Sequence, residues 1–497
     1  MIVNRSFMEK QSIKLRHNLI YQLLNQIATF LTPLLVTPYI SRVLGAEEIG
    51  KYSYAYSIAY YFVAVAGLGI TVHGSRQIAR SRNDAEELNR TFSNLFWLHI
   101  IFSGLIFIIY FILVIYGYIN GENKIISLIM SFYVISASLD MKWLFYGLER
   151  FRETAIRNII IKIIYVIAVY IFVNSENDVN YYAFIISFVT FFISELSLFV
   201  ITPRYVKLRK PDIKQILKQI FPMVILFVPS IANLLLRHID KIMIGKISTY
   251  HQLGLYENCD KIYNILASIV AVLGDVLLPR ISNLLALNKD EIAHKYFRYS
   301  IRVSIIISSA FTFGIIAIAK EFVPIFFGTE FSDCVEILSW LAPTILMVSF
   351  SITIRKQYLI PRYRDKVYLI ATIAALVTNV IANSVLISKY NALGAVYGTL
   401  IAEMVVILCQ FIMLRKELDY RYYIKDIIIY CFIGVVMVFV VRLISILLPL
   451  TDYILLIIEI LVGASIYILL TIFYMYLSKD GLLIYIKNFL NGGKFCG

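Results

Sequence analysis

The stretch Ile424–Leu450, IKDIIIYCFIGVVMVFVVRLISILLPL, and the stretch Tyr453–Leu477, YILLIIEILVGASIYILLTIFYMYL, are almost continuously apolar. With a rise of about 1.5 Å per residue, each is long enough as a helix to cross the ~30 Å hydrocarbon core of a bilayer. Only a short turn fits between them, because Thr451 and Asp452 alone separate the two stretches. They therefore predict two successive transmembrane helices.

The composition of the whole chain agrees with this prediction. Of 497 residues, 60% are hydrophobic and only 16% are charged, whereas a soluble domain carries about 25% charged residues. The net charge of +14 does not indicate a nucleic-acid partner, because the Lys and Arg residues occupy short loops between apolar blocks. The sequence predicts an all-α, polytopic membrane protein with membrane lipids around it and no nucleic acid.

Charge asymmetry between alternate loops predicts the topology. About fourteen spans can be drawn, the first near residues 19–40 and the last near 453–477; 34 of the 46 Lys and Arg then fall in one set of loops and 6 in the other. Basic residues mark the cytoplasmic side. The polar first residues, Met1–His17, lack the apolar run of a signal peptide. We expect an even number of spans and both termini in the cytoplasm.

A weak internal repeat predicts the division of the chain. Gly50-Lys51-Tyr52 in the second span matches Gly254-Leu255-Tyr256 in the eighth. Six spans between the copies predict two pseudo-symmetric six-helix lobes that rock around a central site. We expect an N-lobe over residues 1–202 (spans 1–6), a C-lobe over 203–414 (spans 7–12), and a last part over 415–497 with spans 13 and 14 and a cytoplasmic tail.

Charged residues inside spans 7 and 8 are the first candidate site. They are Arg237, His238, Asp240 and Lys241 on span 7 and Glu257, Asp260 and Lys261 on span 8. One interpretation is a cluster of ion pairs that joins two helices. The other is a polar cavity that binds an anionic group and exchanges protons, and the number of charges favours it.

Two further sets of residues have open interpretations. Tyr52, Tyr56 and Tyr60 share one face of span 2, either as an interfacial aromatic belt or as a cavity wall on which sugar rings stack. Other acids lie inside predicted spans, and each is either a proton-linked carboxylate or a hydrogen-bonded acid; these are Asp140, Glu195, Asp275, Glu403 and Glu459.

The residues give no indication of an enzyme. The five cysteines form no CxxC pair, no Asp-rich motif is present, and the loops are too short for a separate active site. A membrane glycosyltransferase or polymerase would need such a motif or a large external loop. We expect no metal, no cofactor and no catalytic residues.

Several motifs, taken in order and spacing, resemble a known superfamily. They are Pro38-Tyr39-Ile40-Ser41-Arg42-Val43-Leu44-Gly45, Gly50-Lys51-Tyr52, Asp240-Lys241-Ile242-Met243-Ile244-Gly245, Leu253-Gly254-Leu255-Tyr256, Phe326-Phe327-Gly328-Thr329-Glu330-Phe331, Asn379 to Ile387, and Gly394-Ala395-Val396-Tyr397-Gly398-Thr399 with Glu403. The chain resembles the multidrug/oligosaccharidyl-lipid/polysaccharide exporter superfamily. The likeness is to its polysaccharide-transporter branch of Wzx-like O-antigen and capsule repeat-unit flippases.

The resemblance implies a flippase that works by alternating access in the bacterial cytoplasmic (inner) membrane. Its substrate would be an oligosaccharide repeat unit on undecaprenyl pyrophosphate, moved from the inner to the outer leaflet for capsule or lipopolysaccharide O-antigen biosynthesis. Polysaccharide polymerase machinery would be a partner. By position, pyrophosphate binding falls to Arg237, Lys241, Lys261 and Arg42, ion coupling to Asp240, Glu257 and Asp260, and sugar contacts to Tyr52, Tyr56 and Tyr60.

Two related functions share these features. A flippase for a peptidoglycan lipid precursor also handles an anionic head group, and the sequence separates it poorly. A cation-coupled antiporter for drugs or other small molecules usually has twelve spans and fewer cations, so the two additional spans and the basic cluster weigh against it.

Overall fold

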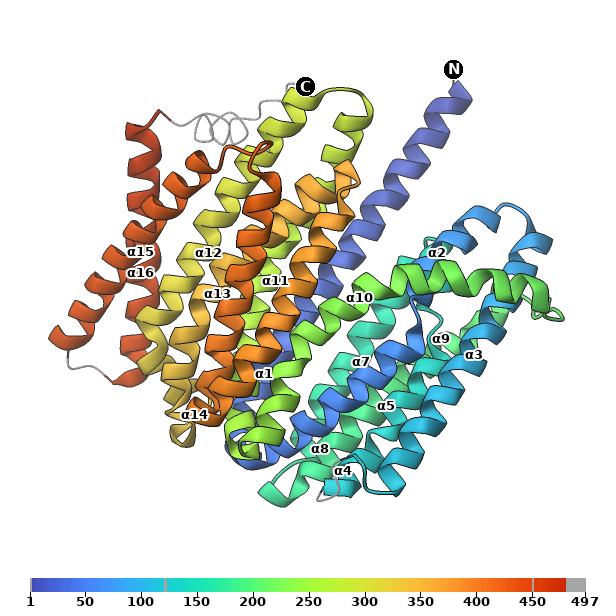
Figure 1. Ribbon diagram of the computed structural model, residues 1–497, viewed down its shortest axis with the longest axis horizontal. Coiled ribbons are helices and arrows are strands. Elements are labelled where there is room, and N and C mark those ends of the chain that lie inside the picture. Colours follow the sequence, from blue (N-terminus) through green and yellow to red (C-terminus); the bar gives the residue numbers. More distant parts are fainter. Residues whose placement is uncertain (1, 120–122, 449–450, 480–497) are drawn as a thin grey trace. The chain divides into compact units, whose positions relative to one another are not determined.

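The computed structural model describes residues 2–119, 123–448 and 451–479, and the regular elements in these ranges are all helices (Figure 1). Among the described residues, eleven helical segments are long and apolar enough to cross a membrane. The prediction of an all-α, polytopic membrane protein is confirmed.

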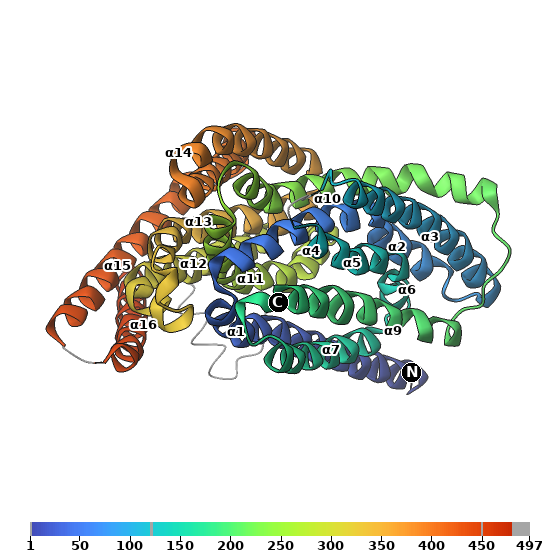
Figure 2. The ribbon, with the colours of Figure 1, turned by 90° about the horizontal axis from the view of Figure 1, so that it is seen from below.

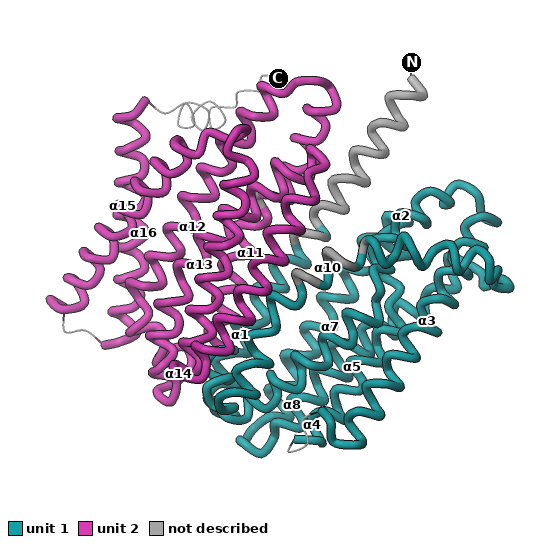
Figure 3. Tube along the Cα trace, in the orientation of Figure 1, with its two compact units in different colours: residues 1–257 teal, residues 258–497 magenta. Residues whose placement is uncertain are grey.

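The helices form two compact units, residues 1–257 and 258–497 (Figure 3). The boundary lies inside helix α11. The predicted lobe boundaries after residues 202 and 414 stay predictions.

Unit 1 runs from α1 to the beginning of α11. Its elements are α1 (Ile2–Gly67), α2 (Ile70–Ser81), α3 (Ala85–Ile115), α4 (Lys124–Ile129), α5 (Ser131–Ser136), η2 (Ala137–Leu139), α6 (Lys142–Gly147), α7 (Phe151–Phe172), η3 (Glu176–Asp178), α8 (Val179–Phe184), the π-helical η4 (Ile185–Ile193), α9 (Ser194–Ile201), η5 (Thr202–Arg204), α10 (Ile213–Ile247) and the first turns of α11 (Tyr250–Ala286).

Unit 2 contains the rest of α11 and all that follows. Its elements are α12 (Asp290–Phe326), η6 (Thr329–Phe331), α13 (Cys334–Ile354), η7 (Arg355–Leu359), η8 (Ile360–Arg362), α14 (Asp365–Leu414), α15 (Tyr420–Leu447) and α16 (Asp452–Leu477).

Two very long helices are broken by a single residue each. In α1 the break is Gly45, with φ 70° and ψ 174°, a conformation that a Cβ atom disfavours. In α14 it is Asn391, with φ 53° and ψ −129°. The segments Leu24–Ser81 and Asp365–Leu414 therefore each contain a residue at which the helix axis can change direction. The count of fourteen membrane spans stays a prediction. The eleven segments would give fourteen spans if each of the two broken segments crosses the membrane twice and α10 crosses it once.

Unit 1 has an aromatic core around Trp143 of α6. The indole is fully buried and stacks on Phe92 of α3, with ring centroids 5.5 Å apart, and Ile78 of α2 and Leu198 of α9 belong to the same cluster. Asp212 begins α10, because its carboxylate accepts the backbone N–H groups of the first turn. Packing of short and long helices thus fixes the first turns of α10 in unit 1.

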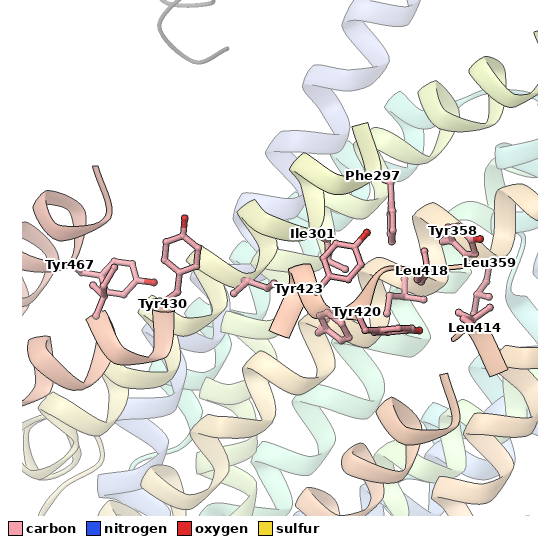
Figure 4. Packing of buried hydrophobic residues seen from close by; sticks show 14 of the residues in the cluster. Phe297, Ile301, Tyr358, Leu359, Leu414, Leu418, Tyr420, Tyr423, Tyr430 and Tyr467 are labelled. Carbon is pink, nitrogen blue, oxygen red and sulfur yellow. The ribbon is translucent and has the colours of Figure 1, made fainter. Parts of the chain in front are cut away.

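Unit 2 has a core of aromatic and aliphatic side chains from helices α12 to α16 and η7. Phe297 and Ile301 of α12, Tyr423 and Tyr430 of α15 and Tyr467 of α16 lie in one cluster (Figure 4). Helices α15 and α16 lie side by side and both pack on α12 (Figures 1 and 2). The last two helices are therefore part of the folded body of unit 2.

Candidate functional site

The charged cluster of spans 7 and 8 has its centre in a buried ion pair. Helices α10 and α11 are joined by a tight turn at Ser248 and Thr249, so Lys241 and Glu257 come to face one another across it. Lys241 Nζ lies 2.7 Å from Glu257 Oε2, and the side chains are 7% and 9% exposed. Ser53 of α1 donates a hydrogen bond of 2.7 Å to the same carboxylate oxygen. Helices α10 and α11 thus meet through two charged side chains of the predicted cluster.

A second polar contact lies next to this pair. The hydroxyl of Tyr256 donates a 2.9 Å hydrogen bond to Asp240 Oδ2, and both side chains are buried. Asp240 of α10 thus binds Tyr256 of α11, and Lys241 of α10 binds Glu257 of α11. The sequence could locate these residues, because ionisable groups inside apolar spans need partners, but it could not identify the partners.

The tyrosine stripe of α1 packs against other helices of unit 1. Tyr52 is buried and meets Tyr182 of α8 edge-on, with ring centroids 4.9 Å apart. Tyr56 stacks on Tyr133 of α5 at 5.5 Å. Tyr60 lies over the His238 ring of α10, with centroids 4.2 Å apart. Tyr56 and Tyr60 are both within electrostatic range of Lys241, so the stripe borders the ion pair. Sugar stacking on these rings stays a prediction.

The other predicted site residues are placed differently. Arg237, one turn before Lys241, is exposed although the two residues are spaced to share a helix face, and Arg42 on α1 is exposed as well. Asp260 and Lys261 lie on the part of α11 that belongs to unit 2, where Asp260 is buried and Lys261 is half-buried. Their roles in anion binding or ion coupling stay predictions.

The repeat motifs form a close helix crossing that the sequence did not foresee. A Cβ atom on Gly50 of α1 would overlap the backbone carbonyl of Tyr250, and one on Gly254 of α11 would overlap that of Ala46. Because neither glycine has a side chain, the backbones of α1 and the start of α11 come close together at both positions. The signal was present, since both glycines belong to matching motifs, but a match in sequence does not reveal a contact in space.

A further buried ion cluster lies in unit 1. Glu195 of α9 is 3.0 Å from Lys142 Nζ of α6 and 3.4 Å from Arg157 Nη1 of α7. Glu195 and Arg157 are each 8% exposed. One carboxylate thus joins three helices, which fits the hydrogen-bonded alternative for Glu195.

In the described part of the chain, no three His, Cys, Asp or Glu side chains gather as metal ligands. Four cysteines, Cys259, Cys334, Cys409 and Cys431, are free thiols. Buried ion pairs in this part of the chain include Lys241 with Glu257 and Arg302 with Asp426.

The fold and these buried charges define a polytopic, α-helical membrane protein. Among solved structures, it is similar to the lipid II flippase MurJ in an inward closed conformation, with a TM-score of 0.72 and 18% identity over 92% of this chain and 98% of that one. It is also similar to an inward-facing multidrug resistance MATE family transporter of the MOP superfamily, with a TM-score of 0.56 and 15% identity over 80% and 97%.

The chain belongs to the polysaccharide biosynthesis protein family, whose sequence profile matches residues 15–285. Among curated proteins, it is 23% identical over 419 residues to a putative O-antigen transporter of Escherichia coli K12, covering 82% of this chain and 99% of the relative. It is 24% identical over 363 residues to the probable low-salt glycan biosynthesis flippase Agl15 of Haloferax volcanii, covering 73% and 75%. These relatives are named as transporters or flippases and not as enzymes.

Proposed function

We propose that this protein is a flippase that moves an oligosaccharide repeat unit linked to undecaprenyl pyrophosphate from the inner to the outer leaflet. Its membrane is the bacterial cytoplasmic membrane, both termini lie in the cytoplasm, and the polymerase that extends the glycan is its partner. The family membership and the names of two relatives, one from a bacterium and one from an archaeon, support transport of a lipid-linked glycan.

The single observation that carries the proposal is the buried Lys241–Glu257 pair beside the tyrosine stripe. A diphosphate is a stronger ligand for an ammonium group than one carboxylate, because it offers more charge and more acceptor oxygens. We infer that the pyrophosphate displaces Glu257 from Lys241, and that Arg237, Lys261 and Arg42 add to the positive field along its route. Glu257, released from Lys241, then takes up a proton or another cation, with Asp240 and Asp260 as further candidates.

The experiment uses deletion of the gene in its host, followed by extraction of the lipid-linked oligosaccharides. Accumulation of the complete repeat unit on its lipid, with loss of the surface polysaccharide, is the expected result. Complementation with Lys241→Met should fail, Lys241→Arg should restore part of the export, and Lys389→Met, which changes an exposed lysine, should restore it fully. An unchanged lipid-linked pool would reject the proposal.

A flippase for a peptidoglycan lipid precursor is the second candidate, because the likeness to MurJ extends over 92% of the chain. The same extraction separates the two functions. Accumulation of the peptidoglycan precursor, with growth arrest, would favour the second candidate. Altered drug sensitivity with both lipid pools unchanged would instead indicate a small-molecule antiporter.

A further inference from the structure

Three of the acids inside predicted spans have different surroundings. Glu195 contacts Lys142 and Arg157 in unit 1, and Asp275 of α11 lies 2.6 Å from Lys356 Nζ in unit 2. Glu459 of α16 is 0% exposed, and neither of its carboxyl oxygens has a hydrogen-bond partner among the described residues. Glu459 is therefore an acid shielded from solvent that lacks the ion pair of the other two among the described residues.

The groups around Glu459 come from the two helices on which α16 packs. The charged groups near it are Glu321 and Lys320 of α12 and Arg442 of α15. The hydroxyl of Ser445 of α15 lies between Glu459 and Glu321, and it donates to Glu321. Lys320 is exposed. All these residues belong to unit 2, so the arrangement is a property of one folded body.

Arg442, the less exposed of the two cations, already binds another carboxylate. Arg442 Nη1 donates to both oxygens of Glu321, at 3.0 and 3.2 Å, and Arg442 Nη2 donates to the carbonyl of Ile316 at 3.3 Å. Ser445 donates to Glu321 Oε1 at 3.2 Å. Glu321 and Arg442 thus neutralise one another, and a negative charge on Glu459 would have no ion-pair partner among the described residues.

We propose that Glu459 is a reversible proton-binding site in the C-terminal helix pair, protonated when α16 is docked on α12 and α15. A carboxylate is not stable in an apolar interior without donors, and a proton removes the charge without needing further ligands. A metal cation would need several oxygen ligands, whereas the nearest carboxylate, Glu321, is committed to Arg442 and Ser445. When water reaches the site, Glu459 releases its proton to water.

Proton release would change the packing of α16. Two carboxylates would then share a single guanidinium group, and like charges in a low-dielectric interior repel one another. The protonation of Glu459 is therefore linked to the docking of α16. The consequence for transport, a dependence on the proton gradient, rests on the proposed function; the existence of the proton site does not.

The test is chemical labelling of the purified full-length protein with dicyclohexylcarbodiimide, which reacts with protonated carboxyl groups in apolar surroundings. Peptide mass spectrometry should locate the adduct at Glu459, and labelling should fall about tenfold for each pH unit above the midpoint, as a one-proton equilibrium requires. Glu321, paired with Arg442, is the internal control and should stay unlabelled. Glu459→Gln, which mimics the neutral acid, should fold and give no adduct at this position.

A second measurement follows the docking of α16. The melting temperature of the wild type should fall as the pH rises through the labelling midpoint, and that of Glu459→Gln should not show this step. No adduct at Glu459, equal labelling of Glu321, labelling that is independent of pH, or protection by sodium would each overturn the proposal. Labelling needs no substrate, so an unchanged lipid-linked pool in the deletion strain would count against the proposed function alone.

Discussion

Lys241 of α10 and Glu257 of α11 form an ion pair of 2.7 Å that is almost completely buried. The two residues are sixteen positions apart, and the turn at Ser248 and Thr249 folds one helix back on the other so that they meet. Ser53 of α1 binds the same carboxylate. Three helices of unit 1 are therefore held together at the place where we propose that the substrate's diphosphate binds.

Removal of one partner of this pair should destabilise the protein more than removal of both. Lys241→Met removes the ammonium group from the buried Glu257 carboxylate, and removal of one partner of a buried pair costs about 3–5 kcal/mol in comparable sites. Lys241→Met combined with Glu257→Gln should recover most of that loss. Thermal unfolding of the purified variants in detergent measures both effects. A double variant that is less stable than either single variant would show that the pair is not the principal interaction.

Transport measurements should also show that Lys241 and Glu257 have different roles. Glu257→Gln keeps Lys241 charged and removes its competitor, so the affinity for a diphosphate-linked substrate should rise while the turnover falls. Binding of a labelled lipid-linked oligosaccharide to the purified variant, compared with its translocation in liposomes, is the measurement. Weaker binding by Glu257→Gln would contradict the displacement of Glu257 by the substrate.

The sequence predicted the membrane fold and the main charged cluster for a physical reason. Apolar length and the cost of burying a charge are local properties, and they can be read from Ile424–Leu450 or from Lys241 without knowing the fold. The partners could not be predicted, because contacts such as Lys142 with Glu195 depend on how the helices pack. For the same reason, the sequence could not distinguish Glu195, which pairs with two cations, from Glu459, whose neighbour Arg442 is paired with Glu321.

The glycine crossing gives a test of helix packing. Gly254→Ala places a methyl group against the carbonyl of Ala46, and a misfit of this kind in a packed interior costs about 1–3 kcal/mol. Gly104→Ala in α3 is the matched control, because no atom lies within 4 Å of the added Cβ. We expect a lower melting temperature and less export for Gly254→Ala, and wild-type values or better for Gly104→Ala. Equal behaviour of the two variants would mean that α1 and α11 do not need this close approach.

The three-helix cluster at Glu195 should be a stability element of unit 1. Glu195→Gln leaves Lys142 and Arg157 without their shared carboxylate. Lys142 keeps Asp140 at 3.7 Å, but the buried Arg157 loses its ion-pair partner, and we expect a loss of about 3 kcal/mol. Glu176→Gln, at an exposed position before α8, is the control. The yield of folded protein and its melting temperature provide the measurement. A Glu195→Gln variant as stable as the control would indicate that other groups compensate the cations.

The start of α10 should be sensitive to acid through Asp212. Its carboxylate accepts the backbone N–H groups of Gln215 and Lys214, at 3.3 and 3.0 Å, and lies 3.3 Å from Arg90. The hydrogen bond from the Gln215 N–H, together with these other contacts, lowers the pKa of Asp212 below its ordinary value. Because the folded-state pKa is the lower one, the stabilisation is present above the unfolded-state pKa of about 3.9 and is lost as the pH falls through the folded-state pKa.

Hydrogen exchange of the first turn of α10 measures this effect. Asp212→Asn keeps a capping side chain but removes the charge, so exchange in residues 213–218 should be faster than in the wild type at pH 6. The difference should shrink below about pH 4, where the wild-type carboxylate also becomes protonated. Glu176→Gln serves again as the control and should leave this turn unchanged at both pH values. A difference between wild type and Asp212→Asn that is the same at pH 3 and pH 6 would assign the stabilisation to the shape of the cap and not to its charge.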